Sequence, residues 1–381
     1  MSEQLILKII DDIEDNLNVL EYLFTNLKII SIDKILKVVN MFISRIKSKL
    51  NELEDIRRIC ERDLPVLRRD KAKYKKLYTQ LIFSLNKHRD EIYHLSEAYE
   101  LLYFCEKICD AHDKNYQALM MVNEYVSNIA KELSIPSLTP TIVHNDYANL
   151  PIEVLGDVYI IMLPALDLLK PKKWILLAHE VGHILFDIHR DRILTDLMPK
   201  IEELLREYLP EERNKEDKVR KYSNLWREEW LKELIADVTG AILGGPAYLK
   251  ILILQLANPG PTSFVTDHPP LEAREIVQLE YLRNVKAPDG LIDMMENTWN
   301  EFRSNIVDEY PELPSYLNRE ILNEAAEYMA NLIPKPFIVS NWDRILELSS
   351  QLPKVREKDL KLLIPAIALI DANIDITEVD R

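Results

Sequence analysis

Glycine is the residue that this sequence lacks most clearly. The chain has 7 glycines in 381 residues, where ordinary usage would supply about 27. Tight hairpins and many helix C-termini use glycine for positive φ angles, so a fold built mainly of strands and hairpins is excluded. The first glycine is Gly156. We therefore expect a mainly helical protein.

Cysteine and long apolar runs are also scarce. The 3 cysteines are an odd number without the spacing of a disulfide framework, which predicts a reducing compartment. Cys105 and Cys109 lie one helical turn apart, and we interpret them as buried thiols rather than as a redox or metal pair. The most apolar stretch, residues 241–257, contains two glycines, a proline, a lysine and a glutamine, so we expect no membrane span.

The N-terminus and the charge balance bear on location and partners. Acidic residues follow Met1 too soon for the apolar region of a signal peptide, so we expect a cytoplasmic protein. There are 48 basic and 63 acidic side chains, which give a net charge of −15. This charge repels phosphate backbones, so nucleic acid is not an expected partner. Hydrophobic residues make up 47% of the chain, which excludes a disordered protein.

Residues 1–135 predict an N-terminal helical bundle. They contain no glycine and one proline, Pro65. Apolar residues three and four positions apart predict two helices in the first 62 residues, which form a hairpin. The two rows are Ile6, Ile10, Ile13, Leu17, Leu20, Phe24 and Leu27, then Ile35, Val39, Phe42, Ile46, Leu53, Ile56 and Cys60. Helices over 66–94 and 96–134 complete the bundle, and we favour this packing over a dimerising coiled coil.

The composition changes at residues 134–140, which contain two prolines. Strands are predicted at Thr141–His144 and at Asp157–Leu163, and Pro171 is suited to the first turn of the helix that follows. From residue 286 the pattern is helical again, with breaks at prolines. We thus predict a bundle (1–135), a catalytic core with a small sheet (136–285) and a helical C-terminal region (286–381), in a mainly α fold of the α+β type.

The sequence His179-Glu180-Val181-Gly182-His183 carries the predicted chemistry. Histidines four residues apart lie on one helix face, so both can bind one Zn²⁺, and the glutamate between them can act as the general base toward a metal-activated water. Gly182 inside this helix costs about 1 kcal/mol relative to alanine. This cost predicts that a neighbouring element comes close to the helix there.

Zinc in such a site requires a third protein ligand, and two residues compete for this role. Glu233 lies in an otherwise apolar helical segment, and Asp237 follows four residues later on the same face. One carboxylate would then bind zinc while the other orients a ligand histidine. The rival is His189, which on an unbroken helix would lie about 240° around and 9 Å along from His183. We therefore favour Glu233.

This pattern resembles the signature of the gluzincin metallopeptidases, HExxH followed by ExxxD. The segment His268-Pro269-Pro270-Leu271-Glu272-Ala273-Arg274 is similar to the HPxxxxR element of the heat-shock and prenyl-protein peptidases in that group. The resemblance covers residues 155–280. It implies a zincin-like core, zinc held by His179, His183 and Glu233, Glu180 as general base, and Asp237 behind the ligands. It also implies that His268 stabilises the oxyanion and that Arg274 supports it.

The sequence makes less specific predictions for one strand and three aromatic residues near the predicted site. In zincins an edge strand above the active-site helix pairs with the extended substrate, a role open to residues 157–163, although an ordinary interior strand is equally compatible with the sequence. Tyr248, Trp226 and Trp230 are expected to pack the metal-bearing helices rather than to touch substrate.

We expect a soluble zinc metallopeptidase whose partner is a peptide or protein substrate. The alternative is a non-catalytic protein in which a metallopeptidase-like core holds zinc and the helical bundle binds partners. Zinc bound without turnover of any peptide would favour that alternative.

Overall fold

The structure of the protein is a computed structural model. It describes residues 3–27, 33–67, 69–110, 113–135, 140–144, 147–151, 158–256, 268–306, 314–333, 337–351 and 364–366. The chain forms two compact units. Unit 1 comprises Met1–Asn123, Ser137–Asn145 and Leu150–Ala165, and unit 2 comprises Glu124–Pro136, Asp146–Asn149 and Leu166–Arg381. The two predicted strand segments, 141–144 and 157–163, therefore group with the N-terminal helices, so both units differ in extent from the three predicted segments.

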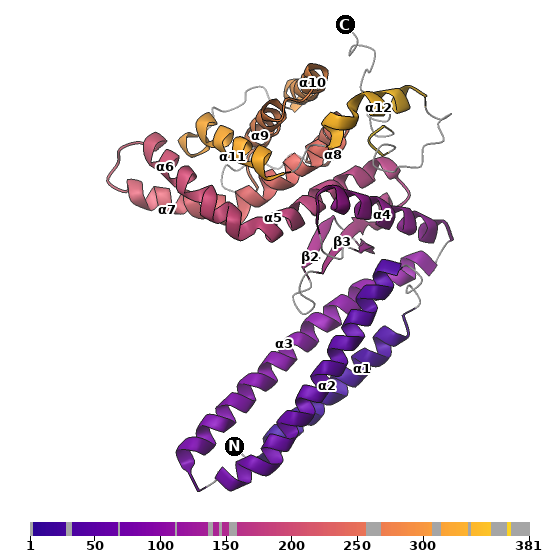
Figure 1. Ribbon diagram of the computed structural model, residues 1–381, viewed down its shortest axis with the longest axis vertical. Helices are drawn as coiled ribbons and strands as arrows, with labels where there is room; N and C mark the ends of the chain where they lie inside the picture. Colours follow the sequence, from indigo (N-terminus) through magenta and orange to yellow (C-terminus); the bar gives the residue numbers. More distant parts are fainter. Residues whose placement is uncertain are drawn as a thin grey trace. The chain divides into compact units, whose positions relative to one another are not determined.

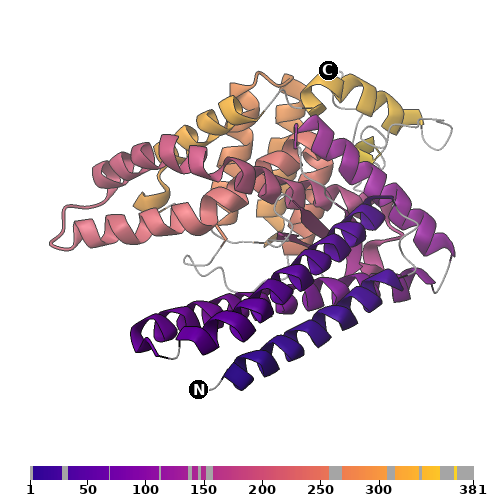
Figure 2. The same ribbon diagram turned by 60° about the horizontal axis from the view of Figure 1, so that its bottom comes forward.

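Unit 1 is built around three long helices, α1 (Glu3–Thr25), α2 (Asp33–Leu67) and α3 (Lys71–Asp110). The three helices lie side by side in both views of the chain (Figures 1 and 2). Every residue of the two predicted apolar rows is buried, as expected for helices that pack along their length. At one end, the rings of Phe24 and Phe42 stack with centroids 4.8 Å apart.

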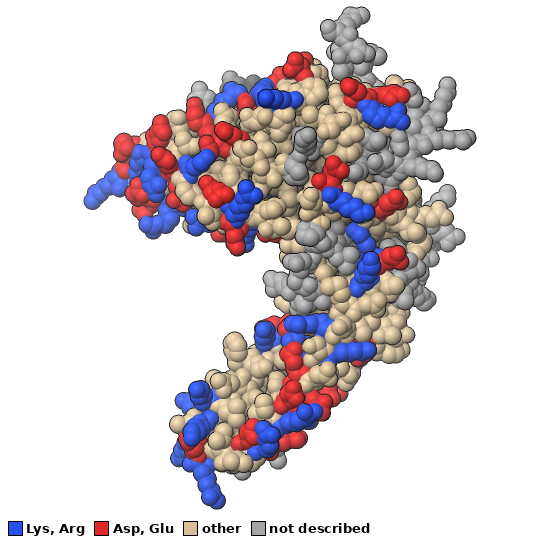
Figure 3. Space-filling view, viewed as in Figure 1, with Lys and Arg blue, Asp and Glu red and all other residues tan. Residues whose placement is uncertain are grey.

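Charged side chains of both signs are interspersed on the visible surface of these three helices (Figure 3). Arg57 of α2, for example, binds Asp11 and Glu14 of α1, each at 2.7 Å. A further pair is buried inside the bundle, where Lys49 Nζ lies 3.1 Å from Glu91 Oε1. Ion pairs thus accompany apolar packing between the helices of unit 1.

Two predicted helix boundaries in this region are wrong. A break was expected near residue 95, but α3 runs for 40 residues through it. Leu95 is fully buried there, so packing continues the helix through Ser96, and a serine alone does not end a helix. The next helix, α4 (Asp113–Glu132), starts later than predicted, and α2 extends to Leu67 with Pro65 inside it.

A small sheet with the order β1-β3-β2 follows the helices. Strand β1 (Thr141–His144) has the predicted bounds and pairs in parallel with β3 (Tyr159–Pro164), with Thr141 opposite Ile161. The second strand was expected from Asp157, which lies outside the described residues. Strand β2 (Ala148–Pro151) was not predicted, because its sequence ANLP contains no β-branched or aromatic residue.

Unit 2 is helical and holds all the predicted metal-site residues. A short 3₁₀ helix, η4 (Pro171–Leu176), leads into the first long helix of this unit, and Pro171 occupies its first turn as predicted. The α-helices that lie wholly in this unit are α5 (Leu177–Asp196), α6 (Met198–Tyr208), α7 (Lys215–Leu225), α8 (Leu231–Leu256), α9 (Leu271–Asn284), α10 (Asp289–Ile306), α11 (Arg319–Leu332) and α12 (Phe337–Gln351). Helix α5 packs along α8, which also contacts α9, α10 and α12.

Gly182 lies where α5 and α8 meet. A Cβ added to Gly182 would fall 2.5 Å from the Cα of Ala236 and 2.9 Å from the Cβ of Thr239. Real Cβ atoms do not approach backbone so closely, so only glycine fits at this position. The predicted close approach of a neighbouring element at Gly182 is confirmed.

Helix α8 is the apolar core of unit 2. It continues from α7 through one π-helical turn, Trp226–Trp230, in which both tryptophans are fully buried. By length and composition alone, the stretch Lys215–Leu252 is long and apolar enough to cross a membrane. Of its most apolar window, 94% is buried inside the structure, as it is for a core helix.

Candidate metal centre

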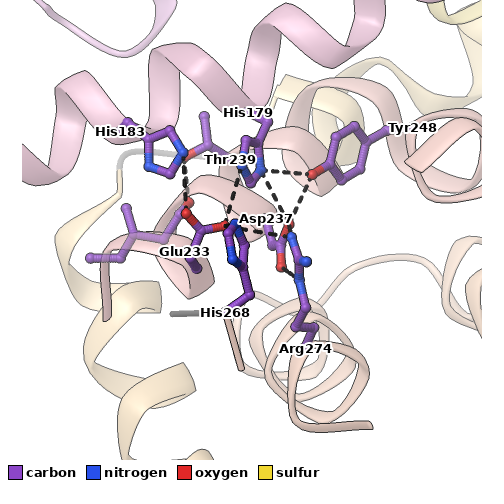
Figure 4. A network of polar contacts seen from close by, with 9 residues as sticks. His179, His183, Glu233, Asp237, Thr239, Tyr248, His268 and Arg274 are labelled. Atoms are coloured by element: carbon purple, nitrogen blue, oxygen red, sulfur yellow. Dashed lines mark hydrogen bonds and ion pairs between the residues drawn. The ribbon is translucent and has the colours of Figure 1, made fainter. Parts of the chain in front are cut away.

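His179 and His183 stand on one face of α5, one turn apart. Their ring centroids are 4.6 Å apart and the rings are nearly perpendicular, at 83°. Both rings turn their Nε2 atoms toward the same carboxylate of α8, that of Glu233 (Figure 4). His183 is buried and His179 is nearly so, which places the pair inside the α5–α8 contact.

The two imidazoles lie near the carboxylate of Glu233, each beside a different oxygen. His179 Nε2 lies 3.6 Å from Glu233 Oε2, and His183 Nε2 lies 3.5 Å from Glu233 Oε1. Two ligands bound to zinc at about 2.0–2.1 Å in tetrahedral geometry stand about 3.3–3.4 Å apart. The two nitrogen–oxygen distances are close to this separation, although each imidazole faces a different oxygen of the carboxylate.

The donor chemistry also fits a divalent cation. Glu233 Oε2 is buried and makes no hydrogen bond to the residues that the structure describes, although a buried carboxylate oxygen normally has a partner. Three carboxylates, Glu180, Glu233 and Asp237, are buried here with one guanidinium, that of Arg274. Acidic groups thus outnumber the guanidinium in this buried cluster. Two imidazoles and a carboxylate are a ligand set that zinc accepts.

Glu180 completes the cluster on the α5 side. One of its carboxylate oxygens and one ring nitrogen of each of His179 and His183 all lie within 4.8 Å of one another. The side chain is 7% exposed. Its charge is felt by Tyr147, whose pKa is raised first by burial and then by the acidic groups around it. Glu180 is thus close enough to the centre to exchange a proton with a molecule bound there.

Behind the ligands lies a buried ion pair between α8 and α9. Arg274 donates hydrogen bonds from Nε to Asp237 Oδ2 and from Nη2 to Asp237 Oδ1, the latter at 2.7 Å. Asp237 is completely buried, and its Oδ1 also lies 3.2 Å from His179 Nδ1. Burial opposes ionisation, but Arg274 and His179 hold the pKa of Asp237 well below its usual range. Asp237 therefore remains a carboxylate that can accept the Nδ1–H of His179.

The electrostatics of the three central groups follow from this arrangement. Burial disfavours the charged form of His179, but the carboxylates of Asp237 and Glu233 outweigh it and raise its pKa to about 10. Burial and the charge of His179 lower the pKa of His183 to about 3. Burial opposes ionisation of Glu233, yet the two histidines lower its pKa to about 2. The carboxylates thus favour a proton on His179, while His183 stays neutral.

Tyr248 belongs to the same network, which the sequence analysis missed. Its hydroxyl donates to Asp237 Oδ1 at 3.0 Å and lies 3.1 Å from His179 Nδ1 (Figure 4). The ring packs between the helices, as predicted, but the hydroxyl reaches the back of a candidate ligand. Sequence spacing does not reveal this contact, because Asp237 and Tyr248 are eleven residues apart on one helix.

The remaining predicted residues lie at different distances from the centre. His268 is 61% exposed, and its Nε2 is 3.6 Å from Glu233 Oε2, so it stands at the solvent side of the site. His189 lies on the unbroken helix α5, which contains no turn that would bring it back toward His183. The structure therefore brings Glu233, and not His189, to the two histidines.

The predicted substrate strand belongs to unit 1 and the site residues to unit 2.

Comparison with protein-family models, with curated proteins and with solved structures found no match. The resemblance to gluzincins accordingly depends on the motif residues named above.

Proposed function

We propose that this chain is a zinc-dependent metallopeptidase of the gluzincin type, with a zincin-like core formed around α5 and α8. The observation that carries the proposal is the convergence of His179 Nε2, His183 Nε2 and the Glu233 carboxylate at 3.5–3.6 Å. These residues would hold the zinc ion. When bound, zinc would acidify a water molecule and polarise the carbonyl of the scissile peptide.

Glu180 is the general base of the proposed reaction. It lies on the same turn as the two histidines, and its carboxylate is within 4.8 Å of a nitrogen of each ring. It takes a proton from the attacking water and passes it to the amine that leaves when the peptide bond breaks. Placement on the buried first half of helix α5 holds the base in position for both transfers.

His268 stabilises the negative charge that develops on the carbonyl oxygen. Its exposed ring faces Glu233 at 3.6 Å and so adjoins the place where a substrate would bind. A donor at this position acts on the transition state more than on the bound peptide, which makes it catalytic. Arg274 acts less directly, because it holds Asp237 and lies 3.8 Å from Glu233 Oε2.

The Glu180→Gln variant tests this function. Glutamine keeps the size of the side chain and removes its basicity, so the variant should bind zinc as the wild type does and lose hydrolysis of an unstructured protein such as casein by at least about 100-fold. A matched control is Asp191→Asn, an exposed acidic residue on the same helix. Hydrolysis that survives Glu180→Gln, or a zinc-loaded wild type without turnover of casein or of a broad peptide library, would contradict the proposal.

A further inference from the structure

Tyr248 reaches the back of His179 by folding toward the start of its own helix. In a straight α-helix, residues 237 and 248 would be separated by about 16 Å along the axis. Yet the Tyr248 hydroxyl donates to Asp237 Oδ1 at 3.0 Å. Helical side chains do lean toward the N-terminus, but a tyrosine side chain does not span this distance. The backbone between the two residues must therefore deviate from a straight helix.

The deviation lies at Gly245 and Pro246. Gly245 has φ +53° and ψ −139°, a backbone conformation outside the helix that side chains with a Cβ rarely adopt. Pro246 follows and has no N–H to continue the hydrogen-bonding pattern. Together they kink α8, so the segment that carries Tyr248 turns back over the residues that precede it.

Two further glycines make room for the tyrosine. A Cβ on Gly240 would fall 2.2 Å from Cζ of the Tyr248 ring. A Cβ on Gly244 would fall 2.8 Å from Cβ of Tyr248 and 2.4 Å from Cδ1 of Ile175. The ring is completely buried. Three of the 7 glycines of the chain are thus placed where Tyr248 requires them.

We propose that Tyr248 is a positioning residue that fixes the tautomer and the orientation of His179 for metal binding. This inference rests on the proposed function. If Nε2 of His179 binds the metal, its remaining ring proton is on Nδ1, and that N–H would point between Asp237 Oδ1 at 3.2 Å and the Tyr248 oxygen at 3.1 Å. Tyr248 in turn donates its proton to Asp237, and the three groups close a triangle.

The other histidine offers an internal comparison. His183 Nδ1 is buried and has no hydrogen-bond partner in the described part of the chain, so nothing described there binds the back of that ring. The phenol is a suitable donor, because a tyrosine hydroxyl carries its proton at neutral pH and this one donates to Asp237 at 3.0 Å. The hydrogen-bonding contact with the Tyr248 hydroxyl is therefore a feature of His179. If it served only packing, phenylalanine would fill the same space equally well.

The test compares Tyr248→Phe with Tyr281→Phe. Tyr281 is an equally buried tyrosine on α9 whose hydroxyl makes no hydrogen bond to the described residues. The readouts are the dissociation constant for zinc, measured by competition with a chromophoric chelator, and the visible absorption bands of bound Co²⁺. We expect about tenfold weaker zinc binding and altered Co²⁺ bands for Tyr248→Phe. Tyr281→Phe should match the wild type in both.

Gly240→Ala provides a second variant, since its Cβ would push the ring away from Asp237. This variant should also bind zinc more weakly than the wild type. If circular dichroism shows that Tyr248→Phe is unfolded, the zinc affinity of Gly240→Ala tests the inference in its place. Wild-type zinc affinity and Co²⁺ bands in a folded Tyr248→Phe protein would overturn this inference and leave the proposed function intact. A wild type that binds neither metal would overturn both.

Discussion

Gly182 of α5 lies so close to Ala236 of α8 that a Cβ on the glycine would fall 2.5 Å from the Ala236 Cα. This contact lies between His179 and His183 on one helix and between Glu233 and Asp237 on the other. It sets the separation at which the two imidazoles reach the carboxylate. The spacing of the candidate metal centre thus depends on the absence of one methyl group.

Replacement of Gly182 by alanine should therefore affect both stability and metal binding. The added methyl group meets backbone, so α5 and α8 must move apart, at a cost of about 1–3 kcal/mol in the free energy of unfolding. Zinc binding should weaken as the ligands separate. Urea unfolding and chelator competition measure the two effects. Asp191→Ala, on the exposed side of α5, is the control, and equal stability of the two variants would show that the contact is not tight.

Asp237→Asn should destabilise the protein in the absence of any metal. The substitution leaves the guanidinium of Arg274, which is 3% exposed, without its counter-charge. Loss of one partner from a buried ion pair costs about 3–5 kcal/mol. Urea unfolding in the presence of EDTA measures the loss. The exposed pair of Arg58 and Glu54 serves for comparison, since solvent screens it and Glu54→Gln should change the free energy of unfolding much less. Similar effects from the two variants would contradict the role of the buried pair.

Two single variants distinguish Glu233 from His189 as the third zinc ligand. Glu233→Ala should abolish stoichiometric zinc binding, because it removes one of three protein ligands, whereas His189→Ala should retain it. Zinc content after gel filtration distinguishes them. The reverse result would indicate a metal site that includes His189 and would require α5 to break beyond His183.

Metal removal should lower thermal stability through mass action. Zinc that binds only the folded chain adds about 2.7 kcal/mol when its free concentration is 100 times the dissociation constant. Scanning calorimetry should therefore record a lower Tm for the wild type after EDTA treatment and dialysis. The Tm of Glu233→Ala should not respond to the same treatment. An identical response of both proteins would mean that the metal binds elsewhere.

Much of the fold was predictable from spacing. The apolar rows of α1 and α2 follow the helical period, and every residue in them is buried. Strand β1 was predicted with its exact bounds from its β-branched residues. The continuity of α3 was not predicted, because burial of Leu95 outweighs the weak tendency of Ser96 to end a helix. Strand β2 has no such residues, and its pairing partner alone makes it a strand.

The candidate site was likewise predictable only in part. The spacing of His179 and His183 predicts their shared face, and the apolar surroundings of Glu233 and Asp237 indicated that both carboxylates have partners. The contact of Tyr248 with His179 depends on a kink, which a helical projection does not represent. The two adjacent glycines and the proline before Tyr248 were its only signal in the sequence.

The central claim is that His179, His183 and Glu233 together hold one zinc ion. The most direct measurement is the metal content of the purified full-length chain by mass spectrometry, after incubation with zinc and removal of the excess. The account predicts one zinc per chain for the wild type and none for a His179→Ala, His183→Ala double variant that is still folded. A folded wild type without zinc, or a double variant that retains it, would contradict the account.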